Sequence, residues 1–120
     1  MKFCWCTITV RDLERSVKFY TDIVGLPVER RFQAGPSTEI CFLGSGETKV
    51  ELICDRTLKE PGTADSVSLG FEVKSLDEKL KFIKEKDLRV HAGPFQPNPR
   101  IRFLYVKDPD GVRVQFVENL

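Results

Sequence analysis

Alternating apolar and polar residues predict short strands in two groups along the chain. In a strand, successive side chains point to opposite sides of the sheet, so each run has one apolar face and one mixed face. Gly, Pro, Asn and Asp residues separate the runs, as in the DPDG turn at residues 108–111. The predicted strands are residues 5–10, 27–32, 38–44 and 48–54, then residues 66–73, 89–93, 100–106 and 112–118.

Apolar residues at helical spacing predict one helix in each half, beginning near Leu13 and near Leu76. Ser75 and Glu78 match a capping box at the second helix, and Asp12 is a suitable cap for the first. Gly25 suits the left-handed residue that ends a helix. The positions expected to be buried are Leu13, Val17, Tyr20, Val24, Leu76, Leu80 and Ile83.

The two halves repeat one order of elements. VRDLERSVKF at residues 10–19 resembles VKSLDEKLKF at residues 73–82, and each segment leads from a strand into a helix. Three further strands follow in each half, so both read β-α-β-β-β. We therefore expect an α+β protein with a single domain, residues 1–120. It consists of module 1–54, linker 55–66 and module 67–120.

Composition and charge exclude several classes of partner. The chain has 19 Lys and Arg against 18 Asp and Glu, so no large field favours nucleic acid or an anionic membrane. No apolar run approaches the roughly 20 residues of a membrane helix, and Met1-Lys2 does not open a signal peptide. We expect a cytoplasmic protein, in which the four cysteines are free thiols because no CxxC pair occurs.

The mixed faces of the strands contain the residues that could bind a ligand or take part in catalysis. An aromatic side chain, hydroxyls, charges and an amide share this side: Trp5, Thr7, Glu51, Ser68, Arg113 and Gln115. Cys4 and Cys6 alternate with Trp5, so they are expected in the core under the first helix. The mixed side is either a solvated face or, if the sheet curls into a cup, the wall of a ligand pocket.

The chain resembles the glyoxalase/bleomycin resistance/extradiol dioxygenase superfamily, also called the vicinal oxygen chelate (VOC) superfamily. The resemblance covers nearly the whole chain, in TVRDLERSVKFYTDIVGLPV, TKVELI, SLGFEVKSLDEKLKFI and FLYVKDPDGVRVQFVE. It implies two βαβββ modules that form a curled mixed sheet, a cup with helices packed outside, and a homodimer. The activity does not follow, because this fold hosts isomerases, dioxygenases and drug-binding proteins.

Metal-dependent relatives resembling glyoxalase I hold a metal at positions that match Trp5, Glu51, Ser68 and Gln115. Only Glu51 has a familiar metal-binding side chain there, since an indole N–H offers no lone pair and a neutral hydroxyl or amide is a weak ligand. A zinc or nickel centre needs three or four suitable ligands. No cofactor is therefore expected.

The resemblance and the residues together favour binding of a small, partly hydrophobic molecule in a metal-free cup. The six mixed-face residues would line that cup, with Trp5 as an aromatic surface and Glu51 as the candidate base, or as the partner of Arg113 or Arg102. One alternative is a glyoxalase I-like lyase or isomerase with Ni or Zn held through Glu51 and Gln115. Another is a non-catalytic dimeric scaffold. His91 is expected in a surface loop.

Overall fold

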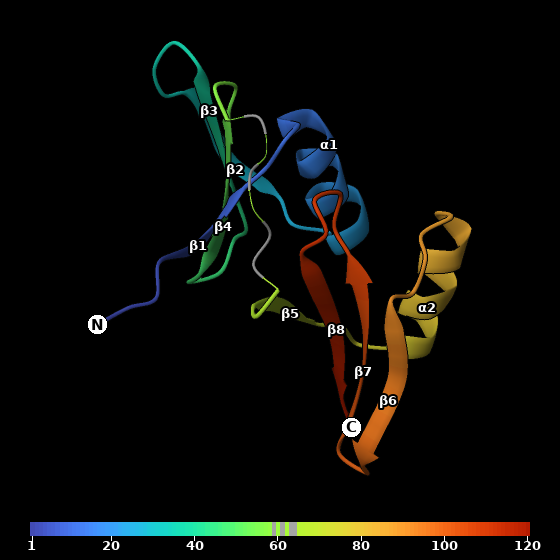
Figure 1. Cartoon of the computed structure of the whole chain (residues 1–120). Helices are drawn as coiled ribbons and strands as arrows, with labels where there is room; N and C mark the ends of the chain where they lie inside the picture. Colours follow the sequence, from blue (N-terminus) through green and yellow to red (C-terminus); the bar gives the residue numbers. More distant parts are fainter. Residues whose placement is uncertain (59, 61, 63–64) are drawn as a thin grey trace. The chain divides into compact units, whose positions relative to one another are not determined.

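A computed structural model describes residues 1–58, 60, 62 and 65–120 of the chain. The chain divides into two compact units, Met1–Gly62 and Thr63–Leu120. Each unit contains a four-stranded mixed sheet and one helical segment in the order β-α-β-β-β, and Figure 1 shows both. The predicted α+β class and the two βαβββ modules are confirmed. Of the predicted linker 55–66, residues 59, 61, 63 and 64 lie outside the described residues, and Asp55 belongs to the preceding strand.

The sheet of the first unit has the strand order β1-β4-β3-β2. β1 runs parallel to β4, as expected for two strands joined by a crossover that contains a helix, and the other neighbours are antiparallel. The strands are β1 (Trp5–Thr9), β2 (Val28–Gln33), β3 (Thr38–Leu43) and β4 (Lys49–Asp55).

The helical segment of the first unit changes type along its length. α1 (Leu13–Lys18) begins after Asp12, whose carboxylate accepts a hydrogen bond from the Arg15 amide at 3.1 Å. A π-helical segment, η1 (Phe19–Val24), follows and ends at Gly25, which has φ +92° as predicted for the closing residue.

The burial of this helical segment follows the predicted spacing only in part. A wider π-helical turn rotates the side chains that follow it relative to an α-helix, which applies to Val24 but not to Val17, because Val17 precedes η1. Leu13 and Tyr20 are buried as predicted, whereas Val17 and Val24 are only half-buried. The other buried positions of this segment are Ser16, Phe19 and Ile23.

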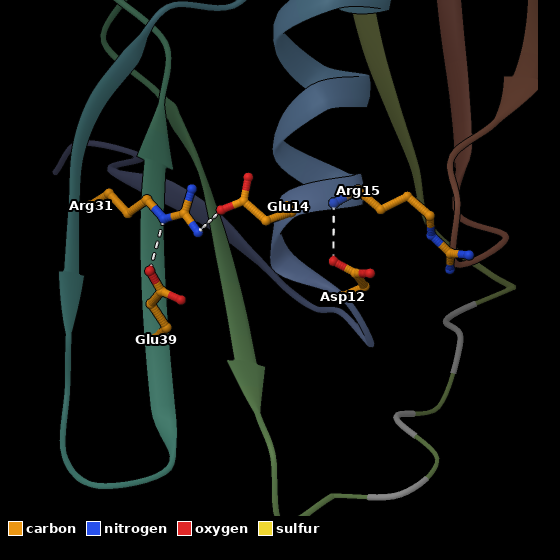
Figure 2. A network of polar contacts seen from close by, with 5 residues as sticks. All are labelled: Asp12, Glu14, Arg15, Arg31 and Glu39. Atoms are coloured by element: carbon orange, nitrogen blue, oxygen red, sulfur yellow. Dashed lines mark hydrogen bonds and ion pairs between the residues drawn. The ribbon is translucent and has the colours of Figure 1, made fainter.

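α1 packs against β3 and β4. A network of ion pairs also connects α1 to the sheet. Arg31 of β2 donates to Glu39 of β3 at 2.8 Å and also pairs with Glu14 of α1 (Figure 2). The hydrogen bonds from Arg31, first to Glu39 and then to Glu14, raise the pKa of Arg31 above its ordinary value. Arg31 therefore lies on the helix-covered side of the sheet and stays charged.

The second unit repeats this arrangement with the strand order β5-β8-β7-β6. α2 (Leu76–Glu85) packs against β8, and Leu76 and Ile83 are buried as predicted. Ser75 accepts a hydrogen bond from the Glu78 amide at 3.2 Å, as its predicted capping role requires. The strands are β5 (Ser68–Glu72), β6 (Ala92–Asn98), β7 (Ile101–Lys107) and β8 (Arg113–Asn119).

β6 differs from the strand predicted at residues 89–93. The strand spans Ala92–Asn98 and includes Pro94 and Pro97. It lies at the edge of its sheet, where a residue without an amide donor is tolerated, and its register shifts twice against β7. The predicted DPDG turn is present, with Asp108 accepting hydrogen bonds from the amides of Asp110 and Val112. No helix among the described residues is long and apolar enough to span a bilayer.

Candidate functional site

The ion pair between Arg31 and Glu14 shows which side of the first sheet faces α1. Because Arg31 contacts α1, the residues on either side of it in β2, Arg30 and Phe32, face away from that helix. We call this side the helix-free face of the first sheet. The register places Thr7, Glu51, Phe42 and Arg30 in one row across its four strands.

Glu51 lies near the middle of this row and is only 9% exposed. Its carboxylate accepts a hydrogen bond of 2.5 Å from the Thr7 hydroxyl on the neighbouring parallel strand. This hydrogen bond fixes the direction of the carboxylate. Both residues were predicted on this face, and the structure brings them together.

The expected arginine partners of Glu51 have other contacts. Arg102 donates to Asp77 of α2 at 3.1 Å, so it lies on the helix-covered side of the second sheet. Arg113 donates to the backbone carbonyl of Asp65 at 2.5 Å. The alternation that assigned Arg113 to the mixed face holds, but the suggested pairing of Arg102 with Glu51 is wrong because Arg102 occupies the opposite side of its strand.

Three aromatic rings form a cluster on the helix-free face of the first sheet. Trp5 and Phe42 meet edge to face, with ring centroids 5.3 Å apart and an interplanar angle of 77°. Phe32 stacks on the other side of Phe42, at 6.3 Å and 14°. Phe42 is buried at 4% exposure, whereas Trp5 is 48% and Phe32 is 38% exposed. The cluster thus presents two accessible rings supported by a buried one.

Arg30 completes this cluster with a positive charge. Its guanidinium carbon lies 4.4 Å from the centroid of Phe42 and 5.3 Å from that of Phe32, within the range of a cation–π interaction. Among the residues that the structure describes, no carboxylate pairs with Arg30. We call Trp5, Phe32, Phe42 and Arg30 the aromatic–arginine cluster.

A β-bulge determines which arginine of β2 belongs to the cluster. The register between β2 and β3 shifts between Val28 and Arg30, so that Glu29 is the extra residue. Val28 is opposite Leu43, and Arg30, two residues on, is opposite Phe42, the next residue of β3. Without the shift Arg30 would face α1 and Arg31 would face away from it.

The second sheet has its own helix-free face, which contains the remaining predicted residues. The Gln115 side chain donates to the Tyr105 hydroxyl at 3.1 Å, and Tyr105 contacts Phe103 edge-on. Ser68 lies beside Arg113 in the parallel pairing of β5 with β8 and is exposed. A Cβ atom at Gly70 would lie 3.3 Å from the Gln115 side-chain oxygen, so glycine leaves room for that amide.

The cysteines and His91 do not form a reactive or metal-binding site in the described part of the chain. All four cysteines are free, and burial raises the pKa of Cys41 above its ordinary value. Cys4 is exposed before β1 begins, so its predicted place in the core is wrong, whereas Cys6 is half-buried. His91 is exposed and precedes β6, in agreement with its prediction as a loop residue. In the described part of the chain, no group of three or more His, Cys, Asp or Glu side chains is arranged to hold a metal ion.

Sequence reasoning missed three members of the aromatic–arginine cluster: Arg30, Phe32 and Phe42. Phe42 was detectable, because Ile40 and Phe42 alternate with Cys41 and Leu43 in β3, so that both faces of this strand are apolar. Arg30 and Phe32 were not, since the bulge at Glu29 is absent from the pattern of β2. The cluster therefore depends on geometry beyond simple alternation.

The fold defines a small protein of two βαβββ units, and comparison with known proteins identifies its family. Residues 2–116 match the sequence model of the Glyoxalase/Bleomycin resistance protein/Dioxygenase superfamily. The chain belongs to this superfamily. The lactoylglutathione lyase of Haemophilus influenzae is 30% identical over 129 residues, covering 99% of this chain and 93% of the lyase.

Solved structures agree with this assignment at the level of the fold. The trypanothione-dependent glyoxalase I of Leishmania major superposes with a TM-score of 0.84 at 22% identity, covering 98% of this chain and 86% of that one. TnmS3, an antibiotic binding protein from Streptomyces sp. CB03234, gives a TM-score of 0.80 at 20% identity, covering 100% of this chain and 97% of that one. The expected family is thus confirmed, and these two likenesses establish the fold alone.

Proposed function

We propose that this protein binds a small, partly hydrophobic molecule on the helix-free face of the first sheet, without a metal ion. The observation that supports this most directly is the contact of the half-exposed Trp5 with the buried Phe42. A ring held by an edge contact offers a flat apolar surface at small entropic cost. Thr7 and Glu51 add polar groups of fixed direction beside it.

The residues at the family's metal positions fit a metal poorly. In the first unit Trp5 has no lone pair to donate, and only Glu51 is an anionic ligand. In the second unit Ser68 and Gln115 are neutral and therefore weak ligands. A divalent transition metal prefers imidazole, thiolate or carboxylate ligands, so this set supports binding without a metal.

The solved relative TnmS3 is an antibiotic binding protein with the same fold, which is compatible with a role in sequestration. We propose for this chain a binding role of the same general kind. The family resemblance also favours a cytoplasmic homodimer, and light scattering coupled to size-exclusion chromatography measures its oligomeric state. A dimer that binds no ligand would instead favour the scaffold function.

The single indole permits a direct test of binding. We expect the Trp5 Nε1–H resonance to shift saturably when ¹⁵N-labelled protein is titrated with a panel of neutral planar aromatic compounds. Trp5→Ala should abolish binding measured by calorimetry while the remaining amide resonances keep their dispersion. Leu58→Ala removes another exposed apolar side chain, just after β4, and should leave binding unchanged. Absence of any saturable shift across the panel would contradict the proposal.

The second candidate function is a metal-dependent lyase, favoured by the similarity to the lactoylglutathione lyase of H. influenzae. In that case Glu51 and Gln115 would contribute to a Ni or Zn site. Metal analysis of protein purified without chelator, followed by an assay with the glutathione hemithioacetal of methylglyoxal, separates the two functions. Stoichiometric metal together with turnover that Glu51→Gln removes would favour the lyase and contradict binding without a metal.

A further inference from the structure

We propose that the aromatic–arginine cluster selects planar aromatic molecules that carry one acidic group. In this arrangement the rings of Trp5 and Phe32 contact the ligand ring, and the guanidinium of Arg30 binds its carboxylate. This inference rests on the proposed function and specifies its ligand class. It depends on Arg30, a residue to which the family resemblance assigned no role.

Arg30 contacts aromatic rings and has no carboxylate partner among the described residues. Its recorded contacts are with the rings of Phe32 and Phe42, and no carboxylate in the described parts of the chain neutralises it. Its neighbour Arg31 instead binds two carboxylates on the other side of the sheet. A guanidinium has a planar fork of donors that matches a carboxylate, and ring contacts leave that fork without an anion.

Lys49 is the other cation near this face, and it already has partners. Lys49 is opposite Trp5 in the register, but its ammonium pairs with Glu29 at 3.2 Å and donates to the Gly46 carbonyl at 2.8 Å. Glu29 is the extra residue of the bulge, so the same irregularity that turns Arg30 toward this face also supplies the partner of Lys49. Of Arg30 and Lys49, Arg30 is therefore the cation available to bind the carboxylate of a ligand.

Glu51 favours one orientation of an acidic ligand on this face. Glu51 and Arg30 lie in the same row on either side of Phe42, and Glu51 is held by Thr7. A ligand carboxylate near Glu51 would be repelled, whereas one beside Arg30 would be attracted. The ligand ring must then lie over the cluster with its acidic end at β2, and a second acidic group at the far end would be disfavoured.

A matched pair of probes tests the charge preference. 2-Naphthoate and 2-naphthamide share one planar ring system and differ in charge. We expect the carboxylate to bind at least about tenfold more tightly in calorimetric titrations, because charge-assisted hydrogen bonds are roughly twice as strong as neutral ones. Both should shift the Trp5 indole resonance. The preference should decrease with added salt, since the cluster is exposed.

Substitutions at the two adjacent arginines locate the effect. Arg30→Gln should remove the preference for the carboxylate while the amide still binds, and Arg30→Lys should retain part of it. Arg31→Gln, on the helix-covered side, should keep the preference, with amide spectra confirming that each variant is folded.

The outcomes separate this inference from the function on which it rests. Equal affinities of the two probes, or a preference that persists in Arg30→Gln, would overturn the role of Arg30 and leave aromatic binding in place. Failure of both probes and of the neutral panel would overturn the proposed function itself. If 2-naphthoate binds more tightly than 2-naphthamide but this preference depends on Arg31, the assignment of the two arginines to opposite faces is wrong.

Discussion

Thr7 and Glu51 show how one hydroxyl orients a carboxylate in the row across the first sheet. Thr7→Val keeps the size of the side chain but leaves Glu51, which is 9% exposed, without this donor. We expect the free energy of unfolding to fall by about 1.5–3 kcal/mol, the range for a hydrogen bond to a charged group. Urea denaturation measures this loss.

Thr9→Val, on the same strand and face, is the matched control for Thr7→Val. Its expected effect is within about 0.5 kcal/mol, because a substitution away from a specific contact changes little. Equal losses for the two variants would mean that strand preference, rather than the bond to Glu51, determines the cost.

Asp55 provides a pH-dependent contact at the end of β4. The Thr57 hydroxyl donates to its carboxylate at 2.7 Å and the Thr57 amide at 2.9 Å, and these bonds lower the pKa of Asp55 below its ordinary value of 3.8. Because the folded pKa is lowered, the contribution to stability is present above 3.8 and is lost as the pH falls through the folded pKa.

We expect Thr57→Val to raise the pKa of Asp55 toward 3.8, since only the amide donor remains. Carboxyl ¹³C shifts recorded across the acid range measure this change. Thr21→Val removes a hydroxyl that binds the Val17 carbonyl and should leave Asp55 unchanged. Titration of Asp55 at or above 3.8 in the unsubstituted protein would contradict the structural assignment.

At the scale of elements, the turn after η1 requires a left-handed residue. Gly25 has φ +92° and its amide donates to the Tyr20 carbonyl at 3.1 Å. A side chain in this conformation costs roughly 1–2 kcal/mol, so Gly25→Ala should destabilise the protein by about that amount. Chemical denaturation measures the loss of unfolding free energy.

Gly46 offers a control of the same chemistry in the turn before β4. Its backbone lies outside the left-handed region and nothing surrounds the position of a Cβ atom. Gly46→Ala should therefore be neutral, or stabilising by about 0.4–1 kcal/mol through the unfolded chain. A comparable loss at both glycines would show that backbone conformation at Gly25 is not the cause.

The elements also show where sequence reasoning succeeds. Caps, turns and periodicity are local signals, so the starts of α1 and α2, Gly25 and the DPDG turn were all predictable. The π-helical segment and the bulge at Glu29 were not predicted, because neither the apolar spacing of residues 19–24 nor the alternation of β2 signals them. The bulge placed Arg30 in the candidate site.

At the scale of the whole molecule, the repeated order βαβββ was visible in the sequence, whereas the different chemistry of the two units was only partly so. The helix-free face of the first sheet combines Trp5 and Arg30 with Glu51. The corresponding face of the second sheet has the neutral pair Gln115 and Tyr105. Alternation assigns a residue to a face, but it does not identify the partner across the strands.

Net charge is a property of the whole chain and predicts how solubility depends on pH. The formal charge is +1 at pH 7 and the isoelectric point is near 7.6, so repulsion between molecules is weakest slightly above neutral pH. We expect a solubility minimum near pH 7.6 in low salt, measured by light scattering across a pH series. Lys81→Glu, on the exposed side of α2, lowers the net charge by two and should move the minimum below pH 7, whereas Lys81→Arg should leave it in place. A minimum that does not follow the charge would mean that exposed apolar side chains such as Phe3 and Trp5, rather than weak electrostatic repulsion, govern association.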